Sequence, residues 1–371
     1  MREPVLARLR DEMERAGLDA AVAVSPENFG WVAGFVVPSQ PIMRWRHAMA
    51  IVGGSETAYV CVDMEETTVA GRAGDVPVRA WGEFSDDAMA VLADELKRLG
   101  LARARIGTEL DYLPAADFAR LKKAMPAAEF LPIDAALDRM RRIKTPDEID
   151  LLRRLSRISD KAIGDAFAAV SPGDTEMDLG AALTRSVYEQ GAEQFRLMIV
   201  ATGPRSELPN VGPTDRVLRP LDVCRVEIFA MIGGYHAGVC RTAVVSEPPE
   251  HAERIWANLV GCKHMLLDTI RPGAVASDIY AAFLAEFGKL GLPPIAFVGH
   301  GIGLNLHEAP YLAAHDDTVL EAGTVMGFEP LVYRTGYGYG MQLKDMVLVA
   351  GEGGADLLSD ATDNDRLIVI G

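Results

Sequence analysis

The chain has 371 residues, 49% of them hydrophobic, and a formal net charge of −16 at pH 7. A chain of this length buries sizeable cores and is expected to form two domains. Its acidic balance excludes nucleic acid as the partner, because binding phosphates requires clustered Lys and Arg.

The termini and the cysteines indicate a soluble, cytoplasmic protein. Charges interrupt every apolar run in residues 1–10, which excludes a signal peptide or an anchor there. No apolar run reaches the roughly eighteen residues that a membrane span requires, so no membrane partner is expected. The four cysteines lack Cys-x-x-Cys spacing, which is typical of reduced thiols.

The first third of the chain alternates between helical and strand patterns. Apolar residues recur at helical spacing in residues 6–16, and a short buried strand is expected at 20–25. Further strands are expected at 47–54, 58–63 and 105–109, and helices at 85–99 and 114–125. Alternation of this kind predicts an α/β domain with helices packed on a sheet.

A domain boundary is expected between Arg139 and Pro146. Thr145-Pro-Asp-Glu148 has the spacing of a capping box, with Pro at the first helical position. A long helix therefore begins the second domain, and we expect domains at 1–140 and 145–371. The elements expected after this helix are helices at 175–189, 250–270 and 276–290 and strands at 197–202, 223–235 and 242–246.

Two short motifs near the C-terminus carry the chemistry. His300 and His307 lie among glycines in the segment 297–310, and Glu329 precedes Pro330 in Gly-Phe-Glu-Pro. This grouping resembles the pita-bread family of aminopeptidase P, prolidase, methionine aminopeptidase and creatinase. The resemblance spans the whole chain and is strongest from Thr145 onward. It implies an α/β (α+β) fold class, with a small creatinase-like N-terminal domain before a pita-bread catalytic domain.

The resemblance also implies a set of metal ligands that this chain lacks in part. Metal-dependent members hold two ions with two aspartates, one histidine and two glutamates. The first motif, Asp-x-Gly…Gly-Tyr-x-x-Asp-x-x-Arg-Thr, aligns without a gap and places Glu227 and Gly238 at the aspartates. The histidine and the first glutamate match as His300 and Glu329, but the final glutamate is Lys344.

Lys344 argues against a pair of metal ions. A protonated lysine only donates hydrogen bonds and cannot coordinate a cation. We therefore expect no metal and no cofactor, with Lys344 occupying the space and charge of the absent metal. A residual site for one ion, made by Glu227, His300 and Glu329, is kept as an alternative, as is a Lys344 that extends to solvent.

Creatinase is the metal-free precedent within this family. Tyr235 and His236 align with the stretch of creatinase that binds substrate. Arg46 is placed like an arginine that one creatinase subunit extends toward the substrate carboxylate of its dimer partner. The upstream catalytic histidine of the family is missing, and Asn210 or a neighbouring residue occupies its place. Cys240 replaces an acidic residue beside Arg-Thr and is interpreted as a packing residue.

We therefore expect a metal-independent, creatinase-like hydrolase that cleaves a C–N bond in a small zwitterionic or carboxylate-bearing compound, acting as a homodimer. In this hypothesis His300 donates or accepts the proton, and Glu329 orients His300 or a water. Lys344 stabilises negative charge or anchors a carboxylate, and Glu227 binds a cationic group. His307 and Arg46 position the substrate. The alternatives are a metal-dependent Xaa-Pro dipeptidase with an atypical ligand set and a non-catalytic protein that binds small molecules or peptides.

Overall fold

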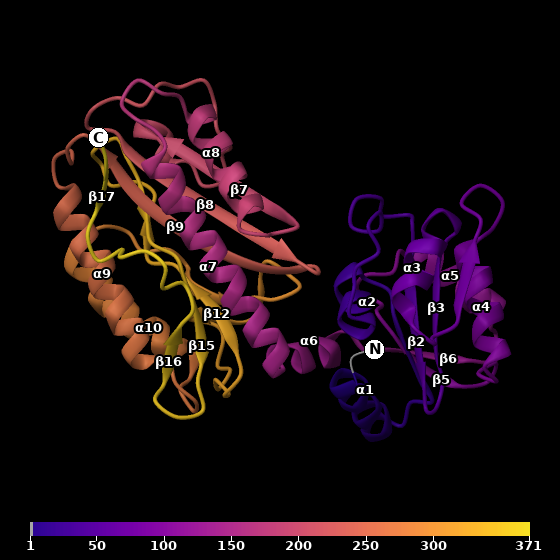
Figure 1. The fold of residues 1–371 in the computed structure, drawn as a ribbon. Coiled ribbons are helices and arrows are strands. Elements are labelled where there is room, and N and C mark those ends of the chain that lie inside the picture. The colour runs from indigo at the N-terminus through magenta and orange to yellow at the C-terminus, as the bar shows by residue number, and fades with distance from the viewer. Residues whose placement is uncertain (1–2) are drawn as a thin grey trace. The chain divides into compact units, whose positions relative to one another are not determined.

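The computed structural model describes residues 3–371 and divides the chain into two compact units, 1–141 and 142–371. Each unit combines helices with a sheet, which confirms the expected α/β fold class (Figure 1). Within the described residues, every helix is too short or too polar to cross a bilayer.

The N-terminal unit is built on a mixed six-stranded sheet in the order β4-β3-β2-β1-β5-β6. The alternating pattern predicted β1, β2, β3 and β5, which are short and mostly buried, but not the more exposed edge strands β4 and β6. β1 pairs antiparallel with β2 and parallel with β5. The strands are β1 (Ala20–Ala23), β2 (Met49–Gly53), β3 (Thr57–Val62), β4 (Val78–Trp81), β5 (Arg105–Thr108) and β6 (Glu129–Pro132).

Two helices of this unit, α2 and α4, begin at side-chain caps. Asp87 accepts a hydrogen bond from the backbone N–H of Met89 at the start of α4, and Ser25 does the same for α2 through Asn28. The helices are α1 (Glu3–Ala16), α2 (Pro26–Ala33), α3 (Glu66–Ala73), α4 (Ala88–Arg98), α5 (Ala115–Ala124) and α6 (Asp134–Arg142).

The C-terminal unit contains a four-stranded sheet in the order β17-β9-β8-β7. A single strand was expected over 223–235, and this was wrong: Gly233 and Gly234 take positive φ angles and turn the chain into a hairpin. Two central residues with positive φ are the turn that suits the twist of paired strands. The strands are β7 (Gln194–Thr202), β8 (Val223–Ile232), β9 (Tyr235–Val245) and β17 (Ile368–Ile370).

A second sheet of this unit has the order β11-β10-β12-β15-β16, and a separate ribbon pairs β13 with β14. Four of the nine predicted site residues, His300, His307, Glu329 and Lys344, lie on this sheet or next to its strand ends. The strands are β10 (Phe297–Gly301), β11 (Glu308–Ala313), β12 (Val325–Phe328), β13 (Leu331–Val332), β14 (Met341–Gln342), β15 (Asp345–Val349) and β16 (Ala355–Leu357).

Two similar helix pairs accompany these sheets. α7 packs on β8 and β9, while α9 and α10 lie side by side (Figure 1). In each pair a Pro-Gly turn precedes the second helix, and the turn glycine, Gly173 or Gly273, donates its N–H to the carbonyl of Leu218 or Leu320. The sequence did not reveal this internal repeat. The helices are α7 (Pro146–Ala168), α8 (Glu176–Glu189), α9 (Ala252–Thr269) and α10 (Ala276–Phe287).

A fully buried ionic network joins α7, β9 and β15. Arg241 of β9 contacts Asp160 of α7 at 2.9 Å and Asp345 of β15 at 2.7 Å, and all three side chains are excluded from solvent. The Arg241 guanidinium also donates to the carbonyl of Lys344 at 2.8 Å. The network therefore fixes the chain immediately before β15, where Lys344 lies.

Replacing Arg241 with Met leaves two buried carboxylates without their cation. We expect the free energy of unfolding to fall by about 3–5 kcal/mol, the usual cost of removing one partner from a buried ion pair. Chemical denaturation measures it. Arg157→Met, which breaks an exposed pair with Asp360, is the matched control and is expected to leave the free energy of unfolding nearly unchanged. Equal losses in the two variants would contradict a special role for the buried network.

Candidate functional site

Four predicted site residues meet in the interior of the C-terminal unit. Glu227 comes from β8, His300 from β10, Glu329 directly follows β12, and Lys344 directly precedes β15. All four are buried. The structure therefore brings together residues that are more than a hundred positions apart in sequence, as the resemblance implied.

The ammonium of Lys344 is the centre of this cluster. Its Nζ lies 3.2 Å from Glu227 Oε1, 3.3 Å from Glu329 Oε2 and 3.2 Å from His300 Nε2. A lysine has three N–H donors, so these three acceptors account for all of them. Burial disfavours the ammonium, but the charges of Glu329 and Glu227 outweigh burial and raise the pKa of Lys344. Lys344 is therefore charged and pointed inward, and does not extend to solvent.

Two glycine positions shape the space around Lys344. A Cβ on Gly327 would lie 3.3 Å from Lys344 Cε, so a glycine there leaves room for the lysine stem. Gly238 is paired with Phe229 in the β8–β9 hairpin, and a Cβ on Gly238 would lie only 2.2 Å from the Phe229 ring. The ring of Phe229 therefore fills the space above Gly238. Lys344 Nζ lies 4.7 Å from the centre of that ring, within range of a cation–π interaction.

Gln342 bridges the two carboxylates from another side. Its amide donates to Glu227 Oε2 at 3.2 Å and to Glu329 Oε2 at 3.0 Å. Its carbonyl oxygen accepts from Arg225 at 2.8 Å, which fixes the direction of the amide. Both glutamates therefore face donors from Lys344 and Gln342, and the carboxylate pair is stabilised without a shared proton.

His300 is held as a neutral imidazole. Its Nδ1 lies 2.8 Å from the carbonyl of Gly301, so Nδ1 carries the proton and Nε2 has the lone pair. Burial, followed by the charge of Lys344, lowers the pKa of His300 well below its ordinary value. Glu329 Oε1 lies 3.6 Å from His300 Nε2, and burial raises the pKa of this carboxyl.

His307 extends the cluster toward solvent. Its ring is parallel to that of His300, with the centroids 3.7 Å apart, and Phe297 and Tyr311 contact its edges. Burial and the charge of Lys344 lower the pKa of His307 to about 4. His307 is therefore neutral at pH 7, and as an exposed side chain it is the part of the cluster within reach of a ligand.

Three of these residues form a group of metal-ligand type. One donor atom from each of His300, His307 and Glu329 lies within 4.8 Å of the others. Two neutral imidazoles and one carboxylate are ligands that suit a divalent transition metal. Because the two rings are stacked, His307 must rotate before both nitrogens point at one ion, and its exposure permits this. The donor set thus fits one ion.

Four other predicted residues, Tyr235, His236, Asn210 and Arg46, lie in surroundings different from those of the cluster. Tyr235 is buried and donates to Glu148 at 2.5 Å, and His236 faces the carbonyl of Gly303. Burial lowers the pKa of His236 to about 4. Asn210 is exposed on a loop where the carbonyl of Pro209 accepts from Arg225 at 2.9 Å.

Arg46 lies in the N-terminal unit, where its guanidinium bonds both oxygens of Glu83 at 2.9 and 2.8 Å. A substrate would have to displace Glu83 to use this arginine. Cys240, in the C-terminal unit, is fully buried, and burial raises the pKa of its thiol well above the ordinary value. Its interpretation as a packing residue agrees with this environment.

Sequence reasoning missed Phe229, Gln342 and Arg225. A signal was present for the first two, since Phe229 replaces the glycine of the Asp-x-Gly motif and Gln342 stands two residues before Lys344. Residues two apart on an extended chain point to the same face. Phe229 therefore lies on the same face as Glu227, and Gln342 on the same face as Lys344. Arg225, two residues before Glu227, has the same spacing, but its contacts with the loop at 206–209 do not follow from it.

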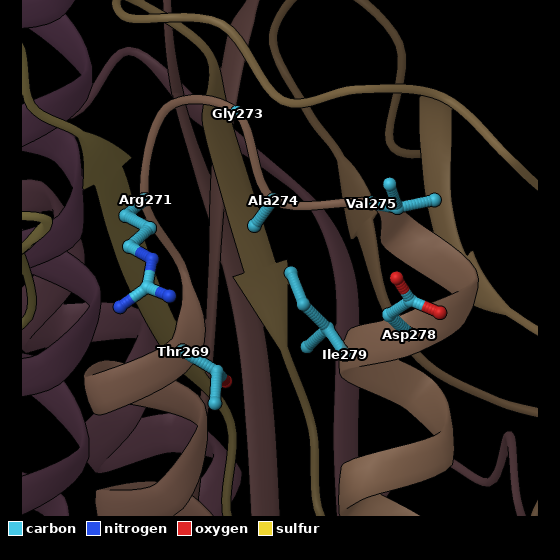
Figure 2. Close-up of a pocket in the computed structure, with 7 residues that line it drawn as sticks. All are labelled: Thr269, Arg271, Gly273, Ala274, Val275, Asp278 and Ile279. Carbon is cyan, nitrogen blue, oxygen red and sulfur yellow. The ribbon is translucent and has the colours of Figure 1, made fainter.

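The C-terminal unit also has a surface recess, which is not lined by any of the site residues described above. It lies at the turn between α9 and α10, has a volume of about 300 Å³ and is lined by Arg271 and Asp278 among others (Figure 2). Both of these side chains are exposed. The recess has opposite charges at its rim, and no cluster of catalytic or ligand groups among the described residues that line it.

Two family models match the chain. The model described as Metallopeptidase family M24 covers residues 150–351, and the Creatinase/Prolidase N-terminal domain covers residues 6–143. These matches confirm the expected resemblance and the expected order of a creatinase-like domain followed by a pita-bread catalytic domain.

Similar proteins are named as dipeptidases. The "Probable dipeptidase PepE" of Mycobacterium tuberculosis is 32% identical over 246 residues, which is 66% of this chain and 65% of that protein. The "Xaa-Pro dipeptidase" of Pyrococcus horikoshii is 27% identical over 92% of this chain and 93% of its own. A solved structure of an Xaa-Pro dipeptidase from Bacillus anthracis is 25% identical, covers 99% of both chains and superposes with a TM-score of 0.85.

These names overturn one expectation. A metal-independent, creatinase-like activity was predicted, and it is wrong, because the chain matches a metallopeptidase family and the similar proteins are named as dipeptidases. The alternative of a metal-dependent Xaa-Pro dipeptidase with an atypical ligand set is better supported. The expectation of a hydrolase acting on carbon–nitrogen bonds is confirmed.

Replacing Lys344 with Met removes the cation between two buried glutamates. We expect the free energy of unfolding at pH 7 to fall by about 3–5 kcal/mol, since Glu227 and Glu329 then face each other without a cation between them. Lys289→Met removes an exposed partner of Glu286 and is expected to cost about 0–1 kcal/mol. Urea unfolding of both variants gives the comparison. A Lys344→Met protein as stable as the wild type would show that the ammonium is not the partner of these carboxylates.

Proposed function

Because the chain belongs to metallopeptidase family M24, we propose that it is a metal-dependent peptidase that cleaves short peptides of the Xaa-Pro type with an atypical ligand set. The observation that carries the proposal is the group formed by His300, His307 and Glu329, whose donor atoms lie within 4.8 Å of one another. The names of the similar proteins support the substrate class.

One divalent ion is the group that these three residues would hold. Bound there, it would polarise the scissile carbonyl and lower the pKa of a bound water. His300 suits this role because its Nε2 already has the lone pair and its Nδ1 is fixed by Gly301. Glu329 suits it because Oε1 faces His300, while Oε2 bonds Lys344 and Gln342.

The remaining residues orient the ligands and the peptide. All three donors of Lys344 are occupied, so its role is to hold Glu227 and Glu329 in place, which replaces the predicted contact with substrate. His307 is exposed and neutral, and a peptide carbonyl or carboxylate can accept its N–H. Phe297 and Tyr311 contact the His307 ring and offer an apolar wall suited to a proline ring.

Glu329→Gln tests the enzymatic part of this proposal. The substitution keeps the size of the side chain but removes its charge, so kcat for an Xaa-Pro dipeptide such as Ala-Pro is expected to fall at least about 100-fold. Glu321→Gln, an exposed glutamate before β12, is the matched control and should retain full activity.

Metal dependence is measured on the same substrate. We expect a chelator to abolish hydrolysis and Mn²⁺ or Co²⁺ to restore it. A wild-type protein that binds Xaa-Pro peptides in calorimetry but hydrolyses none of them, with either metal present, would contradict the proposal and identify a binding protein instead.

We also propose that the chain is a homodimer in the cytoplasm. Trp45, Met64 and Phe84 are exposed by 64, 66 and 95% and surround the Arg46–Glu83 pair, an apolar area that a second copy could cover. All four cysteines are free thiols and buried, which suits a reducing compartment. The substrate-positioning role of Arg46 rests on this dimer and on release of Glu83.

Phe84→Glu tests the dimer. A charge in the middle of this apolar area should shift the protein from dimer to monomer in light scattering, whereas Met177→Glu, at an exposed apolar residue on α8, should leave the mass unchanged. A monomeric wild type, or a dimer that Phe84→Glu does not affect, would contradict the use of this surface.

A further inference from the structure

The residues at the metal position carry too little negative charge for two divalent ions. The family set supplies four carboxylates, which balance the charge of two ions. Here Glu227 and Glu329 are the two carboxylates of the cluster, and Lys344 already neutralises one of them. One divalent ion would leave a single positive charge in a buried site, and two would leave three, at a high cost of desolvation.

Space is lacking as well as charge. The second aspartate position is Gly238, which offers no ligand atom, and the Phe229 ring lies against it. The glycine of the family motif, two residues after the first aspartate, is Phe229 in this chain. The glycine thus stands on the other strand of the hairpin, and the Phe229 ring fills the space of the missing carboxylate.

Lys344 forms ion pairs with the carboxylate oxygens that a second ion would need as ligands. It stands where the bridging glutamate is expected, and its ammonium contacts Glu227, Glu329 and the ring face of Phe229. A pair of ions does not fit these residues.

We infer that Lys344 and Phe229 together replace the second metal ion, so that this chain binds no more than one divalent ion at its site. The inference deepens the proposed function and rests on it for the ion at His300, His307 and Glu329. The ammonium is a built-in cation that orients both glutamates in place of an ion. Because its third hydrogen bond goes to His300 Nε2, it also competes with the first ion for that nitrogen.

Metal stoichiometry tests the inference directly. The wild-type protein, stripped by chelation, is dialysed against Mn²⁺ and analysed by inductively coupled plasma mass spectrometry. The double variant E227Q/E329Q, treated in the same way, gives the number of ions held elsewhere on this acidic chain. We expect the difference to be at most one equivalent. Circular dichroism checks that the double variant is folded, and a difference of two equivalents then overturns the inference.

Restoring the family residues should create the second site. The triple variant F229G/G238D/K344E supplies two new carboxylates and removes the ring and the ammonium, so we expect it to bind two equivalents. The single variant K344E, which keeps Phe229 against Gly238, is the matched control and should bind no more than one. Circular dichroism and the thermal midpoint with and without Mn²⁺ show whether each variant folds. A folded triple variant that still binds only one equivalent contradicts the inference.

The two proposals fail in different ways. A wild type that binds one or no ion and does not hydrolyse Xaa-Pro peptides contradicts the proposed function and leaves the inference intact. A wild type that binds two ions and hydrolyses these peptides contradicts the inference alone.

Discussion

The buried cluster of the C-terminal unit depends on one ammonium group among three acceptors. Glu227 and Glu329 lie together inside the protein, and without a cation they would have to share a proton. Lys344 provides the cation from the chain itself, so the carboxylates are oriented whether or not an ion is bound. The cost of burying a lysine is offset only because all of its donors and a ring face are used.

The surrounding network holds this ammonium in position. Arg241 binds the carbonyl of Lys344 while contacting Asp160 and Asp345, so α7, β9 and β15 meet at the residue next to the cluster. From the other side, Arg225 orients Gln342, whose amide reaches both glutamates. A site supported on both sides by buried charged groups is rigid, because each group would lose its partner if the strands moved.

Local signals in the sequence were sufficient for part of this structure. The capping box of Thr145 and Glu148 predicted where α7 begins, and the motifs around His300, Glu329 and Lys344 identified the main side chains. The hairpin at Gly233 was missed, because two strands and their turn look like one apolar run without the pairing. The contact of Phe229 with Gly238 follows from that register and was therefore missed with it.

The incorrect expectation of metal independence has a physical origin. A lysine at a ligand position excludes an ion at that position, and the expectation extended this exclusion to the whole site. Two carboxylates with one ammonium still leave one negative charge, and His300 and His307 are neutral imidazoles beside it. That remaining charge and those two donors are what a single divalent ion requires. Under the proposed function, the substitution removes one ion's place, while the family ligands His300 and Glu329 remain and His307 joins them as a third donor. This reconciles Lys344 with membership of a metallopeptidase family.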